Sequence, residues 1–330
     1  MVVRASREPA CSAYEPGTAP LPWPCSRANG LAVAILQAIV YADLFDYPLK
    51  APEIHRFLPG WSATLAEVEG CLAHDRRLGV RLGAAAPFWF LAGRDHLVAV
   101  RRQRESSAAA LWASARRYAH LIAALPFVKM VAVTGALAVN NPSSAQDDID
   151  LLIVSQKGRV WLVRGQAVLL VRAVRQLGVT LCPNYVLADH VLDFGPPSLF
   201  TAHELAQLVP LYGWDLYRRI LAINHWVAHY LPNAGAHGEG EPEMGALLRS
   251  SKRVLEAALS WRPGDGLEEW EQRRKIPRLT QEAAARGGAG ALFTPDICKG
   301  HMGDHGAKIL QRFAEALAAH GLPAGEAPHG

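Results

Sequence analysis

The stretch VKMVAVTGALAVNNPSSAQDDIDLLIVS, residues 128–155, decides the fold of this chain. It predicts a strand, a turn at Gly135, a short helix, a polar loop and a second strand that starts at Asp148 and Asp150. Side chains two apart in a strand share one face, roughly 6.5–7 Å apart, so we expect the two carboxylates to lie side by side. Strand, helix and strand in close succession indicate an α/β layer.

This pattern also predicts a chemistry. Two neighbouring carboxylates repel each other unless a cation lies between them. Hard oxygen ligands of this kind suit Mg²⁺. Gly135 stands where a helix begins, and the free N–H groups of a helix start bind phosphate. The stretch therefore predicts a site for phosphoryl or nucleotidyl transfer.

The chain before this stretch predicts a leader, a small module and a linking helix. Residues 1–29 carry many Pro, Ser and small residues without a period, which predicts a disordered leader. Residues 30–93 predict three helices and then two short strands, which is the order of a winged helix. The exposed face of the third helix mixes charges, so we favour packing or protein contact over DNA binding. Residues 94–126 predict the linking helix, which ends at a proline.

The linking helix carries a basic segment near its start, formed by Arg101, Arg102 and Arg104. One interpretation is a solvated helix face between two modules. The other is an electrostatic guide for a polyphosphate or a nucleic acid.

Residues 127–200 predict the α/β core. After the acidic strand, an apolar helix at 159–177 leads to a third strand that is interrupted or bulged at Pro183. Residues 190–194 predict a short fourth strand.

The remaining chain predicts helices. Residues 201–321 form this helical region, in which Thr201 and Glu204 match the spacing of a capping box. Residues 322–330 predict a loose tail.

Bulk composition is that of an ordinary globular protein. The 330 residues are 50% hydrophobic and 19% charged, with a net charge of +4. The five cysteines are scattered without a CxxC pair, which argues against a disulfide framework. No apolar run approaches the roughly 20 residues that a membrane span needs. We expect a soluble, cytoplasmic protein without a membrane partner.

With these elements in place, residues 128–155 resemble the nucleotidyltransferase superfamily that includes DNA polymerase β. That superfamily has Gly-Ser at a helix start, a loop, and then Asp-x-Asp on a strand, which Gly135, Asp148 and Asp150 match. The wider order of modules resembles a group of bacterial nucleotidyltransferase-domain proteins. The fold class that we expect is α+β, with a winged-helix-like module, a nucleotidyltransferase core around a small mixed sheet, and a C-terminal helical region.

The resemblance implies an activity as well. Asp148 and Asp150 would hold Mg²⁺, and the turn at Gly135 and Ala136 would hold the phosphates of a nucleoside triphosphate (NTP). NMP would then pass to an unknown hydroxyl acceptor, which is a small molecule, a protein or RNA. The alternatives are a nucleotide-sensing DNA-binding regulator and a catalytically inactive scaffold.

The chain departs from the superfamily pattern at two points. Ala136 stands where the superfamily has Ser, which removes a phosphate contact worth about 1.5–3 kcal/mol. The superfamily also adds a third carboxylate from a later strand. We assign that role to Asp193 rather than Asp189, because residues 191–194 alternate like a strand.

Overall fold

The computed structural model describes residues 27–176, 178–238, 244–286, 290–300 and 305–323. Most of the expected leader (residues 1–26) and most of the expected tail (residues 324–330) lie outside these ranges. None of the helices in the described ranges combines the length and the apolar character that crossing a membrane requires.

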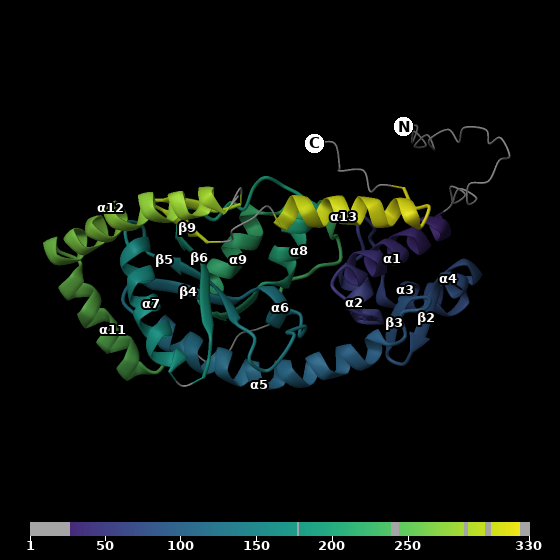
Figure 1. The fold of residues 1–330 in the computed structure, drawn as a ribbon, viewed down its shortest axis with the longest axis horizontal. Helices are drawn as coiled ribbons and strands as arrows, with labels where there is room; N and C mark the ends of the chain where they lie inside the picture. The colour runs from purple at the N-terminus through teal and green to yellow at the C-terminus, as the bar shows by residue number, and fades with distance from the viewer. Residues whose placement is uncertain (1–26, 177, 239–243, 287–289, 301–304, 324–330) are drawn as a thin grey trace, which may run out of the picture.

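The N-terminal part is built from short helices and a small sheet (Figure 1). Its elements are α1 (Arg27–Asp43), β1 (Leu49–Lys50), α2 (Ala51–Arg56), α3 (Leu65–His74), α4 (Arg76–Arg81), β2 (Leu82–Ala85) and β3 (Phe88–Leu91). The strands pair antiparallel in the order β1-β3-β2. Thr64 caps α3 by accepting the N–H of Glu67, and Asp75 caps α4.

A long helix leads from this part to a larger sheet. The elements are α5 (Leu97–Ala123), β4 (Val128–Val133), α6 (Gly135–Ala138), β5 (Ile149–Ser155), α7 (Val160–Arg175), β6 (Leu181–Ala188), α8 (Leu199–Gln207) and β7 (Val209–Tyr212). The chain ends with α9 (Trp214–Ile223), α10 (Val227–Tyr230), α11 (Ala246–Leu259), α12 (Arg262–Ala285), β8 (Leu292–Thr294), β9 (Ile297–Lys299) and α13 (His305–Ala319).

The larger sheet has the strand order β7-β4-β5-β6-β9-β8. Only β5 and β6 pair in parallel, so the sheet is mixed, and the protein combines helices and strands as the sequence predicts. Three of these strands come from residues 201–321, where the sequence predicted helices alone. β7 contains Pro210, which a strand at the edge of a sheet tolerates because its missing N–H breaks no interior pairing.

The expected fourth strand at residues 190–194 is wrong. This segment has no regular structure, and β9 pairs with β6 in its place. The pairing is antiparallel, with Val186 opposite Cys298.

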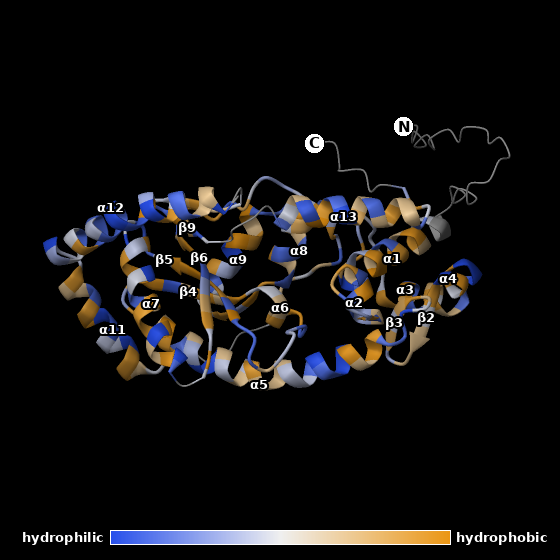
Figure 2. Cartoon of the chain, in the orientation of Figure 1, coloured by the Kyte–Doolittle hydropathy of each residue, from blue (hydrophilic) through white to orange (hydrophobic). Residues whose placement is uncertain are grey.

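Helices cover both faces of the sheet. Val131, Val133, Leu151 and Ile153 pack on one face with residues of α5, α7 and α12. The alternate residues Met130, Ala132, Leu152 and Val154 pack on the other face with α8, α9 and α10. Figure 2 shows the hydrophobic residues of the strands enclosed between these helices. This alternation fixes which face each side chain of β5 occupies.

The first and the last helix of the described ranges pack together. The last helix, α13, lies beside α1, and Ile309, Phe313 and Leu317 pack into the N-terminal core (Figure 1). The N-terminal part is thus joined to the rest by α5 and by α13.

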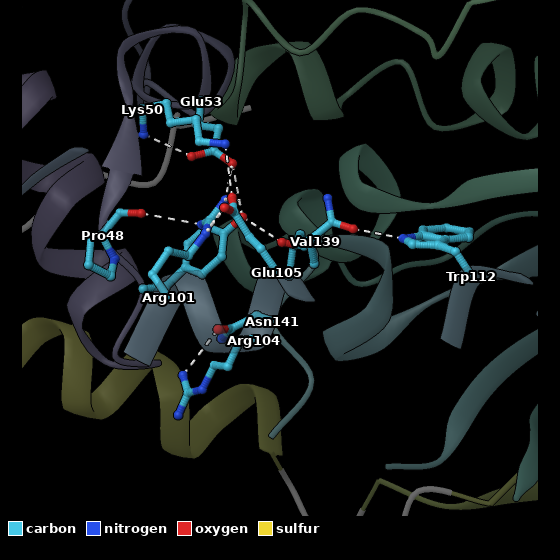
Figure 3. A network of polar contacts seen from close by, with 11 residues as sticks. Pro48, Lys50, Glu53, Arg101, Arg104, Glu105, Trp112, Val139 and Asn141 are labelled. Atoms are coloured by element: carbon cyan, nitrogen blue, oxygen red, sulfur yellow. Dashed lines mark hydrogen bonds and ion pairs between the residues drawn. The ribbon is translucent and has the colours of Figure 1, made fainter. Parts of the chain in front are cut away.

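Arg101 on α5 holds the N-terminal part against this helix. Its side chain is 1% exposed, so neither a solvated face nor a guide for ligands describes it. The guanidinium donates to Glu53 at 2.7 Å, to Glu105 at 3.0 Å and to the carbonyl of Pro48 at 3.3 Å (Figure 3). The guanidinium also lies 3.7 Å from the centre of the Tyr47 ring. This network is a structural junction.

Candidate functional site

Asp148 and Asp150 lie together at the start of β5. Asp150 shares the face of Leu152 and Val154, which is the face that α8 covers. Single ligand atoms of Asp148, Asp150 and Cys182 all lie within 4.8 Å of one another. This is the arrangement that the spacing of the two aspartates predicts.

The glycine turn lies directly against this pair. Because β4 and β5 are antiparallel, the end of β4 meets the start of β5, and the N–H of Thr134 donates to the carbonyl of Asp150 at 3.0 Å. Gly135 has a φ of +65°, and a Cβ there would lie 2.5 Å from Oδ2 of Asp150. Only glycine combines this backbone conformation with such a close approach. The backbone of the turn and the Asp150 carboxylate therefore form one surface.

A bulge in β6 brings two further side chains to Asp150. The pairing shifts between Asp150–Cys182 and Leu152–Tyr185, which confirms the irregularity predicted at Pro183. Bulges commonly re-aim side chains next to functional sites. The amide of Asn184 donates to Oδ1 of Asp150, and the thiol of Cys182 donates to Oδ1 of Asn184 at 2.8 Å. The proline signalled the bulge, but nothing in the sequence signalled these contacts.

The site gathers negative charge. Burial and then the charges of Asp148, Glu204 and Asp147 together raise the pKa of Asp150 to about 7, against a smaller opposing effect of Asn184. Burial and the two aspartates likewise raise the pKa of the Cys182 thiol to about 11, so it keeps its proton at neutral pH. Carboxylates alone are then the hard anionic ligands, and repulsion between them is relieved when a cation binds.

Besides Asp147, Glu204 is a further carboxylate whose charge acts on Asp150, and the sequence did not identify it. Ser198 caps α8 by accepting the N–H of Thr201 at 3.1 Å, so the predicted capping box of Thr201 and Glu204 is wrong. Glu204 therefore lies in the body of the helix, where its exposed side chain lines a cavity together with Gly135 and Ala136. Desolvation by the surrounding protein raises the pKa of the Glu204 carboxyl, and the positive charge of Lys299 opposes this shift.

The structure does not bring Asp193 to the aspartate pair. It lies in the irregular segment after β6, its side chain is exposed, and its carboxylate accepts the N–H of Gly195 at 3.0 Å. Asp189 instead accepts the N–H of Lys157 at 3.1 Å. Asp193 thus holds a turn at its own position and Asp189 holds the turn at Lys157, which the alternation of residues 191–194 did not reveal.

A cavity of about 200 Å³ adjoins the glycine turn. It lies between α1 of the N-terminal part and the helices α6 and α8 of the sheet part. Ala136 is exposed and lines this cavity, so the hydroxyl that the superfamily places at this position would face the cavity.

The loop after α6 is held by side chains of α5. Trp112 donates to Oδ1 of Asn140 at 2.7 Å, and Arg104 donates to Oδ1 of Asn141 at 3.0 Å (Figure 3). Asn140 has a φ of 55°, a conformation that asparagine tolerates better than most residues. These contacts hold the loop that follows the glycine turn, and Asn141 also lines the cavity.

Comparison of the chain with protein-family models, with curated proteins and with solved structures gave no match. The functional argument therefore depends on the chemistry and the geometry of the site itself.

Proposed function

We propose that this protein is a Mg²⁺-dependent nucleotidyltransferase that moves NMP from an NTP to a hydroxyl acceptor. One observation carries the proposal. Asp148 and Asp150 lie together at the start of β5, and the backbone of Gly135 packs on the carboxylate of Asp150. A carboxylate pair beside a glycine turn supplies a place for a cation and, against it, a place for phosphate oxygens.

The residues present fit Mg²⁺ rather than a softer metal. Asp148 and Asp150 offer carboxylate oxygens, and Cys182 keeps its proton and donates to Asn184. Thiolate-preferring metals would need the sulfur as an anion. Bound at Asp148 and Asp150, Mg²⁺ would supply charge neutralisation of the phosphates during transfer.

Glu204 is the side chain that we assign to proton transfer. It lines the cavity beside Gly135 and Ala136, and its pKa is raised above the ordinary value of a carboxyl, which makes it a stronger base for proton transfer. The acceptor hydroxyl would give its proton to Glu204 while its oxygen bonds to the α-phosphorus. The bond from that phosphorus to the bridging oxygen breaks, and pyrophosphate leaves.

The N-terminal part supports the same proposal in its coarser features. The order α1, β1, α2, α3, α4, β2, β3 and the sheet order β1-β3-β2 support a winged-helix-like module in which α4 is an added short helix. Glu67 and Glu69 are exposed on α3, and this helix contains no Lys or Arg. A helix of this charge is poorly suited to the major groove, so we assign the module to packing rather than to DNA binding.

The test uses NTPs labelled at the α-phosphate, with Mg²⁺ and with small-molecule, protein and RNA fractions as acceptors. Label transfer and pyrophosphate release are measured for the wild type and for the double variant Asp148→Asn/Asp150→Asn. We expect the double variant to lose transfer by roughly a thousandfold or more, because it loses the cation ligands. Asp215→Asn, at an exposed position of α9, is the matched control. Equal signals from the wild type and the double variant would refute the proposal.

A second pair of variants separates the two candidates for the third carboxylate. We expect Glu204→Gln to reduce transfer by roughly 10²-fold or more and Asp193→Asn to leave it near the wild-type rate. The reverse result would restore the assignment of Asp193.

A further inference from the structure

The cavity beside the glycine turn has walls made mainly of rings and small side chains. From α1 and the turn after it come Ala38, Tyr41, Ala42 and Phe45, while Phe57 and Phe200 contribute further rings. Ala38 and Ala42 face the cavity where larger side chains would fill it. An apolar space of about 200 Å³ with aromatic walls suits a flat, uncharged ring.

One polar group of this wall lacks a partner. His203 on α8 is 5% exposed, and its Nε2 is buried without a hydrogen bond in the described part of the chain. Its ring stacks on Tyr41, with the ring centres 4.1 Å apart and the planes 8° from parallel. Burial lowers the pKa of this imidazole to about 3, so it is neutral. Buried polar atoms in native structures nearly always have partners, so the unpaired Nε2 of a residue that lines this cavity points to a ligand that supplies the partner.

The tautomer of His203 defines what that ligand must offer. The amide nitrogen of Gln207 lies 3.5 Å from Nδ1. With the amide donating in this orientation, Nδ1 is the acceptor and the ring proton resides on Nε2. The open group is then an N–H donor, and the matching ligand atom is a carbonyl oxygen or a ring nitrogen.

The cavity also reaches the proposed catalytic site. Gly135, Ala136 and Glu204 lie there, and Gly135 in turn contacts the carboxylate of Asp150. A ring bound in the cavity would therefore lie next to the carboxylate site, and a second polar substituent of the ring would reach that site.

We propose that this cavity binds a flat aromatic ring that carries a hydrogen-bond acceptor for Nε2 of His203. Two sources share this chemistry: the base of the NTP and an aromatic hydroxyl compound that serves as the acceptor. Placing the ring next to the transferred phosphate rests on the proposed function, whereas ring binding itself does not require a metal or a reaction.

The test titrates the metal-free full-length protein, in EDTA, with adenosine, uridine and 4-hydroxyacetophenone. Saturation-transfer NMR and calorimetry report binding. We expect at least one probe to bind with a Kd of roughly 1 mM or tighter. Binding by the nucleosides assigns the cavity to the base, and binding by 4-hydroxyacetophenone alone assigns it to the acceptor. Absence of binding by all three probes overturns the proposal.

Variants locate the bound ring. Ala42→Leu fills the cavity, and we expect it to weaken binding at least tenfold, whereas Ala73→Leu, an exposed position on α3, should not change it. His203→Phe keeps a ring on Tyr41 but removes the donor, and a roughly fivefold loss is expected. Phe45 is 39% exposed, so Phe45→Ala removes part of the wall with little risk to folding. Wild-type binding by both Ala42→Leu and Phe45→Ala overturns the proposal.

The double variant Asp148→Asn/Asp150→Asn distinguishes this proposal from the transferase. We expect it to bind the ring like the wild type while it transfers no label. A wild-type protein that binds the ring but transfers nothing would refute the transferase and leave the cavity assignment standing.

Discussion

Arg101 is a buried ionisable side chain and Asp150 a half-buried one, and the two differ in the charges that surround them. Arg101 lies among Glu53, Glu105 and the carbonyl of Pro48. Burial alone would lower its pKa, but Tyr47 and Glu53 more than reverse this, and the net shift is upward. Asp150 lies among Asp148, Asp147 and Glu204, all of the same sign. Within the described ranges no ion pair involves it.

The difference separates a structural charge from a ligand-binding one. A buried charge with opposite charges and hydrogen bonds around it is complete without any further partner. A half-buried carboxylate among like charges is destabilised in the free protein and is relieved by a cation. We therefore assign Arg101 to folding and propose that Asp150 serves binding, and each role predicts the sign of a mutation's effect.

Arg101→Met should produce the largest effect on stability. It leaves Glu53 and Glu105 without their buried partner, and removing one member of such a cluster costs about 3–5 kcal/mol. Urea denaturation measures the loss. Arg102→Met at the exposed neighbouring position should change stability by no more than about 0.5 kcal/mol. A loss of stability below about 1 kcal/mol for Arg101→Met would contradict the structural role of Arg101.

Gly135→Ala should cause the second-largest loss of stability, about 2–3 kcal/mol. The left-handed backbone costs about 1–2 kcal/mol for a residue with a side chain, and the added Cβ also conflicts with Oδ2 of Asp150. Gly158→Ala is the matched control, since Gly158 has a φ of +70° and open space around its Cβ position. The excess loss in urea denaturation at Gly135 over Gly158 reports the close approach. Equal losses would mean that the turn does not pack on the carboxylate.

Asp150→Asn should stabilise the metal-free protein, with the opposite sign to Arg101→Met. The pKa of Asp150 is raised from 3.8 to about 7 in the folded state, so the folded state binds more protons between these values. The contribution is favourable below pH 4 and is lost as pH rises through 7. At pH 8 in EDTA we expect a gain of about 1–2 kcal/mol, reduced from the full shift because the side chain is partly exposed.

The measurement is the difference between wild-type and Asp150→Asn unfolding free energies from pH 4 to 8. It should change by at most roughly 1.4 kcal/mol per pH unit. Mg²⁺ should raise the stability of the wild type and leave the variant unaffected. A difference that does not change with pH would place Asp150 among ordinary surface carboxylates.

The sequence could predict those features of the Asp150 site that involve residues close together in the chain. A spacing of two residues on a strand places Asp148 and Asp150 together, and a glycine after the preceding strand marks the turn. Glu204 and Asn184 could not be predicted, because α8 and the bulge of β6 reach Asp150 only through packing.

The burial of Arg101 was hidden for the same reason. Its neighbours in the chain, Arg102 and Gln103, are exposed and typical of a surface helix, whereas Pro48 and Glu53 lie about fifty residues earlier. The strands β7, β8 and β9 escaped prediction because they are too short to show a period of two.

The structural and the ligand-binding region are connected, and Tyr47→Phe tests the connection with the smallest expected effect. The Tyr47 hydroxyl lies 3.0 Å from Oε1 of Glu53 and 2.5 Å from the carbonyl of Val139, in the segment that follows the glycine turn. Phenylalanine keeps the ring beneath Arg101 and removes only the hydroxyl, so the loss of stability should be about 1 kcal/mol in urea denaturation.

Because Trp112 holds the same segment through Asn140, Trp112→Phe provides the partner for a double-mutant cycle. If the two contacts jointly position the turn, Mg²⁺ affinity by calorimetry should fall more in the double variant than the single losses add up to. Strictly additive losses, or unchanged affinity in all three variants, would show that the Arg101 network stabilises the fold without positioning the site.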